Sequence, residues 1–197
     1  MRAGLLQGAL AALLALPVLA AAAEAPEGPG LKAGVFSPPR AAPEFALRGS
    51  DGTELKLSRY RGKVVILEFG FTSCPDVCPT TLAALAQVRK KLGAEGDQLQ
   101  VVYVTVDPER DDAERLRTYL AAFDPSFVGA TGSAKQLAAV RQEYGIAASK
   151  HASATGYTFS HSSYTYLIDR EGNLRALMPY GQTADDYVHD VKILLEQ

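Results

Sequence analysis

Two almost continuously apolar runs, separated by a helical pattern, constrain the fold of this chain more than any other feature. The first run is VVILEF (residues 64–69) and the second is LQVVYVTVD (residues 99–107). Such runs predict central strands that are covered on both faces of a sheet. Between them, Leu82, Leu85 and Val88 recur at helical spacing. A strand, a helix and a strand in this order predict a right-handed crossover and hence parallel strands.

The flanking sequence extends this unit into a single α/β domain. Short strands are expected around the turn at residues 49–52, and Ser133 with Gln136 matches a capping box at the start of a helix. Residues 147–160 are polar and aperiodic, and we interpret them as a loop. SYTYLIDREGNLRALMPY then predicts a β-hairpin, and Thr183 can cap a final helix. This order predicts a thioredoxin-like fold: a central mixed sheet with flanking helices, an N-terminal β-hairpin and inserted helices.

Residues 1–23 have the composition of an export signal. Arg2 is the only charged side chain before a long apolar stretch that ends in alanines. This pattern predicts a secretory signal peptide that is cleaved between residues 20 and 24. The alternative is an uncleaved membrane anchor, because residues 3–23 are just long enough to span a bilayer. Both interpretations predict an exported protein, in the periplasm or on the outer face of the cytoplasmic membrane.

The rest of the chain is long enough for one well-packed domain. Residues 24–43 are rich in Pro and Gly and are predicted to be a linker, followed by a folded domain over residues 44–197. The chain is 47% hydrophobic, and its net charge is -2 with both signs interspersed. Without a basic stripe, the sequence predicts no nucleic-acid partner.

Both cysteines lie in FGFTSCPDVCPT, where the first apolar run gives way to a helix expected to begin near Pro79. In an exported protein, Cys74 and Cys78 form a disulfide by default. That bond would close a loop of only five residues, which stabilises a fold by about 2 kcal/mol. A domain of this size hardly depends on that amount. The pair is therefore expected to serve chemistry rather than stability.

The start of a helix favours ionised thiols. The partial positive charge of a helix N-terminus lowers the pKa of Cys78 and of a nearby Cys74. Thiolates either exchange disulfides or bind soft metals. On one helix, residues four apart have Cβ atoms about 5–6 Å apart, whereas a relaxed disulfide needs about 3.8 Å. Cys74 is therefore expected in the loop before the helix.

A metal site would need a third donor, and the chain has few. We interpret His151 as exposed in the polar loop, His189 as a surface or packing residue of the last helix, and Met178 as core. His161 is different, because it comes just before the strand YTYLID. In a thioredoxin-like sheet this position faces the start of the cysteine helix, so His161 is the candidate third donor. Zinc also accepts two cysteines, a histidine and a water.

Four segments carry a resemblance to a known family. GKVVILEFGFTSCPDVCPTTL, VTVDPERDD, YLAAFDPSFVGATGS and FSHSSYTYLIDREGNL, in this order and spacing, resemble the SCO/SenC family of copper-binding, thioredoxin-fold proteins. The resemblance covers about residues 43–197. It implies that Cys74, Cys78 and His161 bind one copper ion, Cu(I) or Cu(II). It further implies a copper chaperone for the dinuclear copper centre of cytochrome c oxidase. Ser73 departs from the family pattern, since many members carry histidine there.

The same resemblance implies the partners. They are the copper-centre subunit of cytochrome c oxidase, a periplasmic thiol reductant and another copper carrier, with membrane contact only if the N-terminus is uncleaved. The alternative function is a thiol–disulfide reductase that acts on the cysteines of that copper site, and a peroxidase or redox sensor is a third. The CxxxC spacing and the lack of a proline beside His161 favour copper. Asp76 and Asp107 are candidate partners of the second His161 nitrogen, although cap or turn roles suit both.

Overall fold

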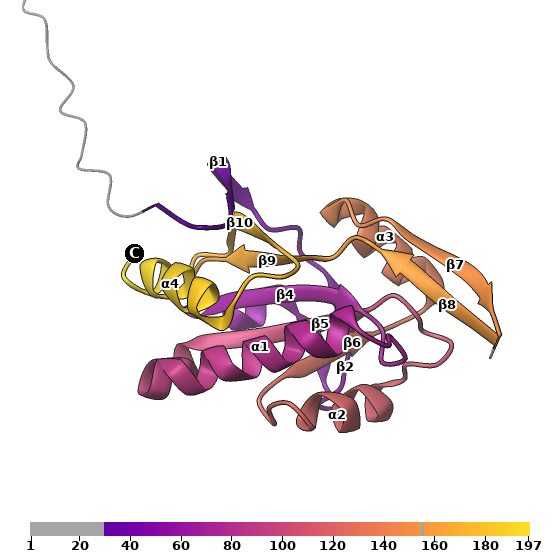
Figure 1. Ribbon diagram of the computed structural model, residues 1–197. Coiled ribbons are helices and arrows are strands. Elements are labelled where there is room, and N and C mark those ends of the chain that lie inside the picture. The colour runs from indigo at the N-terminus through magenta and orange to yellow at the C-terminus, as the bar shows by residue number, and fades with distance from the viewer. Residues whose placement is uncertain (1–29, 155) are drawn as a thin grey trace, which may run out of the picture. The chain divides into compact units, whose positions relative to one another are not determined.

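The predicted strand–helix–strand unit forms the centre of the computed structural model, which describes residues 30–154 and 156–197 (Figure 1). It consists of β4 (Val64–Gly70), α1 (Val77–Leu92) and β5 (Leu99–Thr105). The two strands pair in parallel along their whole length, and all their residues are buried. The predicted export signal, residues 1–23, lies outside the described residues.

The central sheet is mixed, as predicted. Its strand order is β1-β10-β9-β4-β5-β6-β2-β3. The β4–β5 and β5–β6 pairs are parallel, whereas β9 runs antiparallel to β4. The remaining strands are β1 (Gly34–Ala41), β2 (Ala46–Gly49), β3 (Glu54–Lys56), β6 (Val128–Thr131), β9 (Tyr164–Ile168) and β10 (Asn173–Pro179).

Helices cover both faces of this sheet. The other helices are α2 (Ala113–Ala121), α3 (Ala134–Tyr144) and α4 (Ala184–Leu195), with short 3-10 helices at Leu57–Tyr60 and Gly93–Gln98. On one face α1 and α4 lie side by side (Figure 1), and they share a hydrophobic core with α2. On the other face α3 packs with β2 and β3. The predicted helix starts are confirmed, since Ser133 and Thr183 both form capping boxes.

The interpretation of residues 147–160 as a loop is wrong. This stretch forms a separate two-stranded sheet of β7 (Ala148–Ser153) and β8 (Gly156–His161). Most of its side chains are exposed, so no apolar alternation marks the strands in the sequence. We call this element the histidine hairpin, because β8 ends at His161 and thereby fixes where that residue enters the domain.

Part of the predicted linker also belongs to the sheet. Strand β1 pairs with β10 at the sheet edge, and the compact unit extends from Leu31 to Gln197. Pro38 and Pro39 fall between the paired segments of β1, where a missing N–H is tolerated. Among the helices of residues 30–154 and 156–197, none combines the length and the apolar character that a membrane span needs.

We predict that Asp190 anchors the start of this compact unit. Its buried carboxylate accepts hydrogen bonds from the backbone N–H groups of Lys32 (2.8 Å) and Ala33 (2.9 Å). Asp190→Ala leaves these donors without their acceptor and should lower the free energy of unfolding by about 1–3 kcal/mol in a urea titration. Asp185→Ala, which removes an exposed ion pair with Lys91 and one negative charge in the first turn of α4, should change it by less than about 1 kcal/mol. Equal effects of the two variants would contradict the anchor.

Candidate metal centre

The end of β4 and the start of α1 place the two cysteines. Cys74 lies in the connecting loop, half-buried, and Cys78 lies in the first turn of α1, fully buried. Both are free thiols. The Cys74 N–H donates to the carbonyl of Phe71 (3.1 Å), which makes a turn before the helix. The prediction that Cys74 precedes the helix is confirmed, although the helix begins at Val77 rather than near Pro79.

His161 lies beside the cysteines in the fold, although it follows Cys78 by 83 positions in the sequence. Its Nε2 atom lies 3.7 Å from Cys78 Sγ. Two donors on one metal, with bonds of about 2.3 Å to sulfur and about 2.0–2.1 Å to nitrogen, lie roughly 3.6–3.8 Å apart at tetrahedral to trigonal angles. The observed distance suits such a pair. Within the described residues, no group of three or more His, Cys, Asp or Glu side chains is already set around a metal position.

A backbone carbonyl orients the His161 ring. Nδ1 lies 2.9 Å from the oxygen of Ser162, and Phe71 packs edge-on against the ring with centroids 6.0 Å apart. With Nδ1 donating to this carbonyl, Nε2 is the nitrogen that faces the sulfur. Neither Asp76 nor Asp107 takes the place of the carbonyl, since Asp107 instead accepts from the hydroxyl of Tyr157. A partner on the adjacent backbone has no signature in the sequence.

The two cysteines divide the roles of thiolate and thiol. A hydrogen bond from Cys78, opposed by burial and helped by His161, lowers the pKa of Cys74 to about 3. The interaction with Cys74 and burial raise the pKa of Cys78. The expectation of a lowered pKa for Cys78 is therefore wrong, because these two effects outweigh the charge of the helix N-terminus. These shifts favour a thiolate at the half-buried Cys74 and a protonated thiol at the buried Cys78. A metal that binds both sulfurs must displace that proton.

The floor of the site is closely packed and poor in hydrogen bonds. Glu68 and Tyr103 are buried, and Glu68 Oε2 and Tyr103 Oη have no hydrogen-bond partner among the residues that the structure describes. Burial, together with the Cys74 thiolate, raises the pKa of Glu68 well above its usual value and favours the uncharged acid. A Cβ atom on Gly70 would lie 2.8 Å from Cys78 Sγ. Glycine thus leaves the space that this sulfur occupies.

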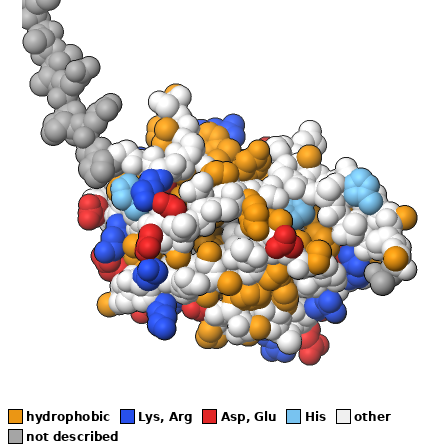
Figure 2. Space-filling view, in the orientation of Figure 1, with side chains coloured by type: hydrophobic (Ala, Val, Ile, Leu, Met, Phe, Trp, Pro, Cys, Tyr) orange, Lys and Arg blue, Asp and Glu red, His pale blue; other side chains and the backbone are white. Residues whose placement is uncertain are grey.

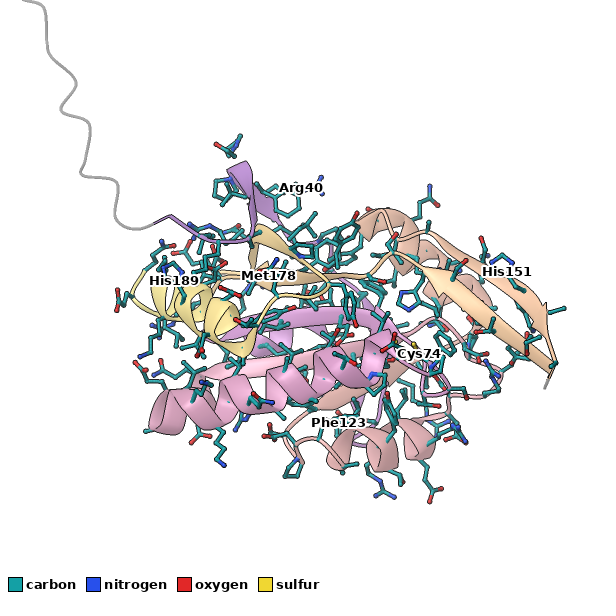
Figure 3. All side chains as sticks on the ribbon, viewed as in Figure 1. Arg40, Cys74, Phe123, His151, Met178 and His189 are labelled. Carbon is teal, nitrogen blue, oxygen red and sulfur yellow. The ribbon has the colours of Figure 1, made fainter. Side chains whose placement is uncertain are left out.

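The other donors considered from the sequence lie elsewhere. Met178 is fully buried in the core. His151 is exposed on β7 and pairs with Ser160 (2.7 Å), while His189 contacts Asp190 (2.9 Å). Figure 3 places His151 and His189 on opposite sides of the domain, both well away from Cys74. Of these candidate metal donors, His161 is the one that lies beside a cysteine sulfur.

The geometry defines a thioredoxin-like domain with two thiols at the start of a helix and one imidazole beside them. The family model SCO1/SenC matches residues 36–196. The chain therefore belongs to the SCO1/SenC family.

The relatives are longer than the matched part of this chain. The chain is 35% identical over 153 residues to the mitochondrial protein SCO2 homolog of Mus musculus, covering 76% of this chain and 60% of that protein. It is 34% identical over 132 residues to an SCO2-like protein of Rickettsia conorii, covering 66% and 64% of the two chains. The chain thus spans less than two thirds of the length of these curated relatives.

Solved structures share the fold along most of this chain. Apo Sco1 of Thermus thermophilus is 37% identical with a TM-score of 0.76, covering 84% of this chain and 98% of that one. Copper-bound ScoI of Bradyrhizobium japonicum is 31% identical with a TM-score of 0.73, covering 79% and 99%. BsSco, described as having a disulfide switch and as a member of the Sco family of cytochrome c oxidase assembly proteins, is 26% identical with a TM-score of 0.64, covering 80% and 95%.

We predict that Cys74 stays nucleophilic in mildly acidic solution. An ordinary thiol, with a pKa of about 8.5, loses reactivity about tenfold for each pH unit below that value. Because the pKa of Cys74 lies near 3, its alkylation rate by iodoacetamide should stay nearly constant from pH 8 to pH 5, while Cys78 remains unmodified. Peptide mass spectrometry of the reduced protein measures both rates.

Cys78→Ala provides the control for this experiment. It removes the hydrogen bond that is the largest cause of the lowered pKa, so alkylation of Cys74 should become strongly pH-dependent. A wild-type rate at Cys74 that falls tenfold per pH unit would contradict the assigned thiolate.

Proposed function

We propose that this protein binds one copper ion through Cys74, Cys78 and His161 and delivers it during assembly of the dinuclear copper centre of cytochrome c oxidase. The observation that carries the proposal is the approach of His161 Nε2 to Cys78 Sγ at 3.7 Å. Two solved relatives support it. ScoI of Bradyrhizobium japonicum has copper bound, and BsSco is described as a member of a family of cytochrome c oxidase assembly proteins. In this proposal copper is the cargo of the protein rather than a permanent cofactor.

The donor set suits copper in both oxidation states. Soft thiolates favour Cu(I), and an imidazole ligand allows the same site to hold Cu(II). Three protein ligands leave an open position through which a donor of a partner can enter and remove the metal. Zinc accepts the same three donors with a water, so a titration must compare the two metals. The protein supplies the orientation of the donors and a buried floor that includes Glu68 and Tyr103.

The surface beside His161 suits contact with a partner. Tyr164 and Tyr180 line a small hollow together with His161, and they are 46% and 44% exposed. In the view of Figure 2, hydrophobic side chains gather toward the middle of the face, and many charged side chains lie toward its left edge. Exposed aromatic side chains are enriched at protein interfaces. The proposed partners are the copper-centre subunit of the oxidase, a thiol reductant and another copper carrier.

The proposed location is outside the cytoplasm. Residues 1–23 support export through a signal peptide or an uncleaved anchor. The periplasm or the outer face of the cytoplasmic membrane then receives the folded domain. There a reductant must keep both thiols reduced, because a disulfide between Cys74 and Cys78 removes two of the three metal donors.

A thiol–disulfide reductase acting on the cysteines of the same copper site is the second candidate. The division of roles between the cysteines favours it, because a half-buried thiolate can attack a disulfide and a neighbouring thiol can resolve the mixed disulfide. The disulfide switch described for BsSco is consistent with redox chemistry at such a pair. His161 separates the two functions, since disulfide exchange does not need a third metal donor.

We predict that His161→Ala weakens copper binding on the order of 100-fold or more, because it removes a metal ligand. Residues that only hydrogen-bond a ligand typically contribute about 10–100-fold to metal affinity. A competition titration of the reduced protein with a copper chelator measures this affinity, and a parallel titration tests zinc. His151→Ala is the matched control, since the ring of this exposed residue pairs with Ser160 on the hairpin, and the substitution should leave the affinity unchanged.

The same variants separate the two functions. His161→Ala should still reduce a disulfide-containing copper-site domain of the oxidase in the presence of a copper chelator. If His161→Ala binds copper as tightly as the wild-type protein, the metal assignment is wrong. Full reductase activity together with unchanged copper affinity would then leave the thiol function as the better description.

A further inference from the structure

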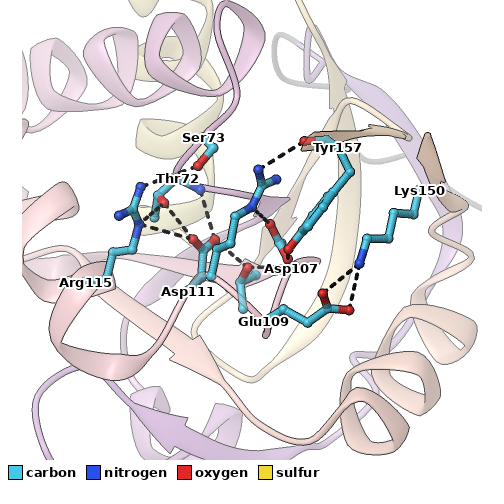
Figure 4. A network of polar contacts seen from close by, with 10 residues as sticks. Thr72, Ser73, Asp107, Glu109, Asp111, Arg115, Lys150 and Tyr157 are labelled. Atoms are coloured by element: carbon cyan, nitrogen blue, oxygen red, sulfur yellow. Dashed lines mark hydrogen bonds and ion pairs between the residues drawn. The ribbon is translucent and has the colours of Figure 1, made fainter. Parts of the chain in front are cut away.

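The histidine hairpin needs an anchor outside the main sheet. Strands β7 and β8 pair only with each other, and most of their side chains are exposed. His161 comes from this hairpin, whereas both cysteines come from the β4–α1 connection. The pairing of β9 with β4 and the packing of Phe159 on Phe71 bring this hairpin to the cysteines. The distance between imidazole and sulfur then also depends on how the polar side of the hairpin is held against the rest of the domain. The loop of residues 107–111, between β5 and α2, contacts both parts (Figure 4).

One side of this loop holds the hairpin. The Tyr157 hydroxyl donates to Asp107 Oδ1 (3.0 Å), and Arg110 Nη1 donates to the Tyr157 carbonyl (3.0 Å). The Arg110 guanidinium also lies over the Tyr157 ring, 3.9 Å from its centroid, and pairs with Asp107. Farther out, Lys150 forms an ion pair with Glu109 at 2.7 Å. Both strands of the hairpin are thus tied to the loop.

The other side of the loop holds the segment before Cys74. Asp111 is fully buried and accepts hydrogen bonds from the N–H (2.9 Å) and the hydroxyl (2.6 Å) of Thr72, and from the hydroxyl of Thr105 (2.7 Å). Arg115 adds a bond to the Thr72 hydroxyl (2.6 Å). A buried carboxylate with several donors fixes the geometry of the groups around it.

The loop itself is pinned to the sheet. The Asp111 N–H donates to the Asp107 carbonyl (3.0 Å), and the Thr131 hydroxyl of β6 donates to the Asp111 carbonyl (2.8 Å). The Asp107 N–H donates to the Thr105 hydroxyl (2.9 Å). A short loop with hydrogen bonds to β5 and β6 therefore joins the two segments that carry the donors.

We propose that residues 107–111 act as a brace that sets the spacing between His161 and the cysteines, with Tyr157 and Asp111 as positioning residues for copper binding. This inference rests on the proposed copper function. Donors from separate segments bind a metal more tightly when they are held in place before binding, since less ordering remains to be done. Tyr157 acts through His161, and Asp111 acts through the cysteine loop.

Tyr157→Phe tests the hairpin side of the brace. It removes only the hydroxyl that bonds Asp107 and keeps the ring beneath Arg110. We expect copper affinity to fall about 10-fold, at the lower end of the range for groups that orient a ligand. The alkylation rate of Cys74 should not change, because the bonds of Asp111 to Thr72 remain. Tyr60→Phe, which removes a buried hydroxyl without a hydrogen-bond partner among the described residues, is the control and should bind copper like wild type.

A double-mutant cycle separates positioning from general destabilisation. In the His161→Ala background, Tyr157→Phe should cause no further loss of copper affinity, because the ligand that it positions is already absent. The same tenfold loss in both backgrounds, or no loss from Tyr157→Phe in the wild-type background, would overturn the brace. Unchanged affinity of His161→Ala itself would instead overturn the proposed copper function, so the two failures are distinct.

Asp111→Asn tests the cysteine side independently. It places an amide where Thr72 and Thr105 require an acceptor, so it should weaken copper binding by loosening the segment before Cys74. If Asp111→Asn folds and binds copper like the wild-type protein, the loop does not position Cys74. If Asp111→Asn does not fold, the Tyr157→Phe cycle still decides the hairpin side of the brace.

Discussion

The chemistry proposed for this protein depends on the contact between Cys78 and His161. The two residues are 83 positions apart, and their donor atoms lie 3.7 Å from each other. Each is held by a different element, Cys78 by the first turn of α1 and His161 by the end of β8. The central sheet brings these elements together, because β4 leads into the cysteine loop and pairs directly with β9, the strand that follows His161.

The surroundings of this contact are arranged for a thiolate next to a thiol. Gly70 leaves room for the Cys78 sulfur, and the hydrogen bond from Cys78 lowers the pKa of Cys74 to about 3. Burial favours the uncharged form of Glu68 close by. Such a site can exchange disulfides as it stands and can bind a soft cation once Cys78 gives up its proton. The His161 imidazole matters for binding the cation and is not needed for disulfide exchange.

Sequence periodicity predicts the buried parts of this structure well and the exposed parts poorly. Strands β4 and β5 are almost continuously apolar because both their faces are covered, and Ser133 and Thr183 mark helix starts by a local hydrogen-bond pattern. Most side chains of the histidine hairpin are exposed, so its sequence pattern predicts a loop. The hairpin is placed by tertiary contacts such as that between Tyr157 and Asp107, and no local sequence pattern predicts such contacts. Likewise, nothing in the acidic run before α2 distinguishes Asp111 as the buried partner of Thr72.

X-ray absorption at the copper edge of the reduced, copper-loaded protein tests the three-donor site most directly. We expect two sulfur donors and one imidazole nitrogen in the wild-type spectrum, with the imidazole contribution lost in His161→Ala and retained in His151→Ala. A spectrum without sulfur, or an imidazole contribution that persists when His161 is replaced, would contradict the assignment of Cys74, Cys78 and His161 as the copper ligands.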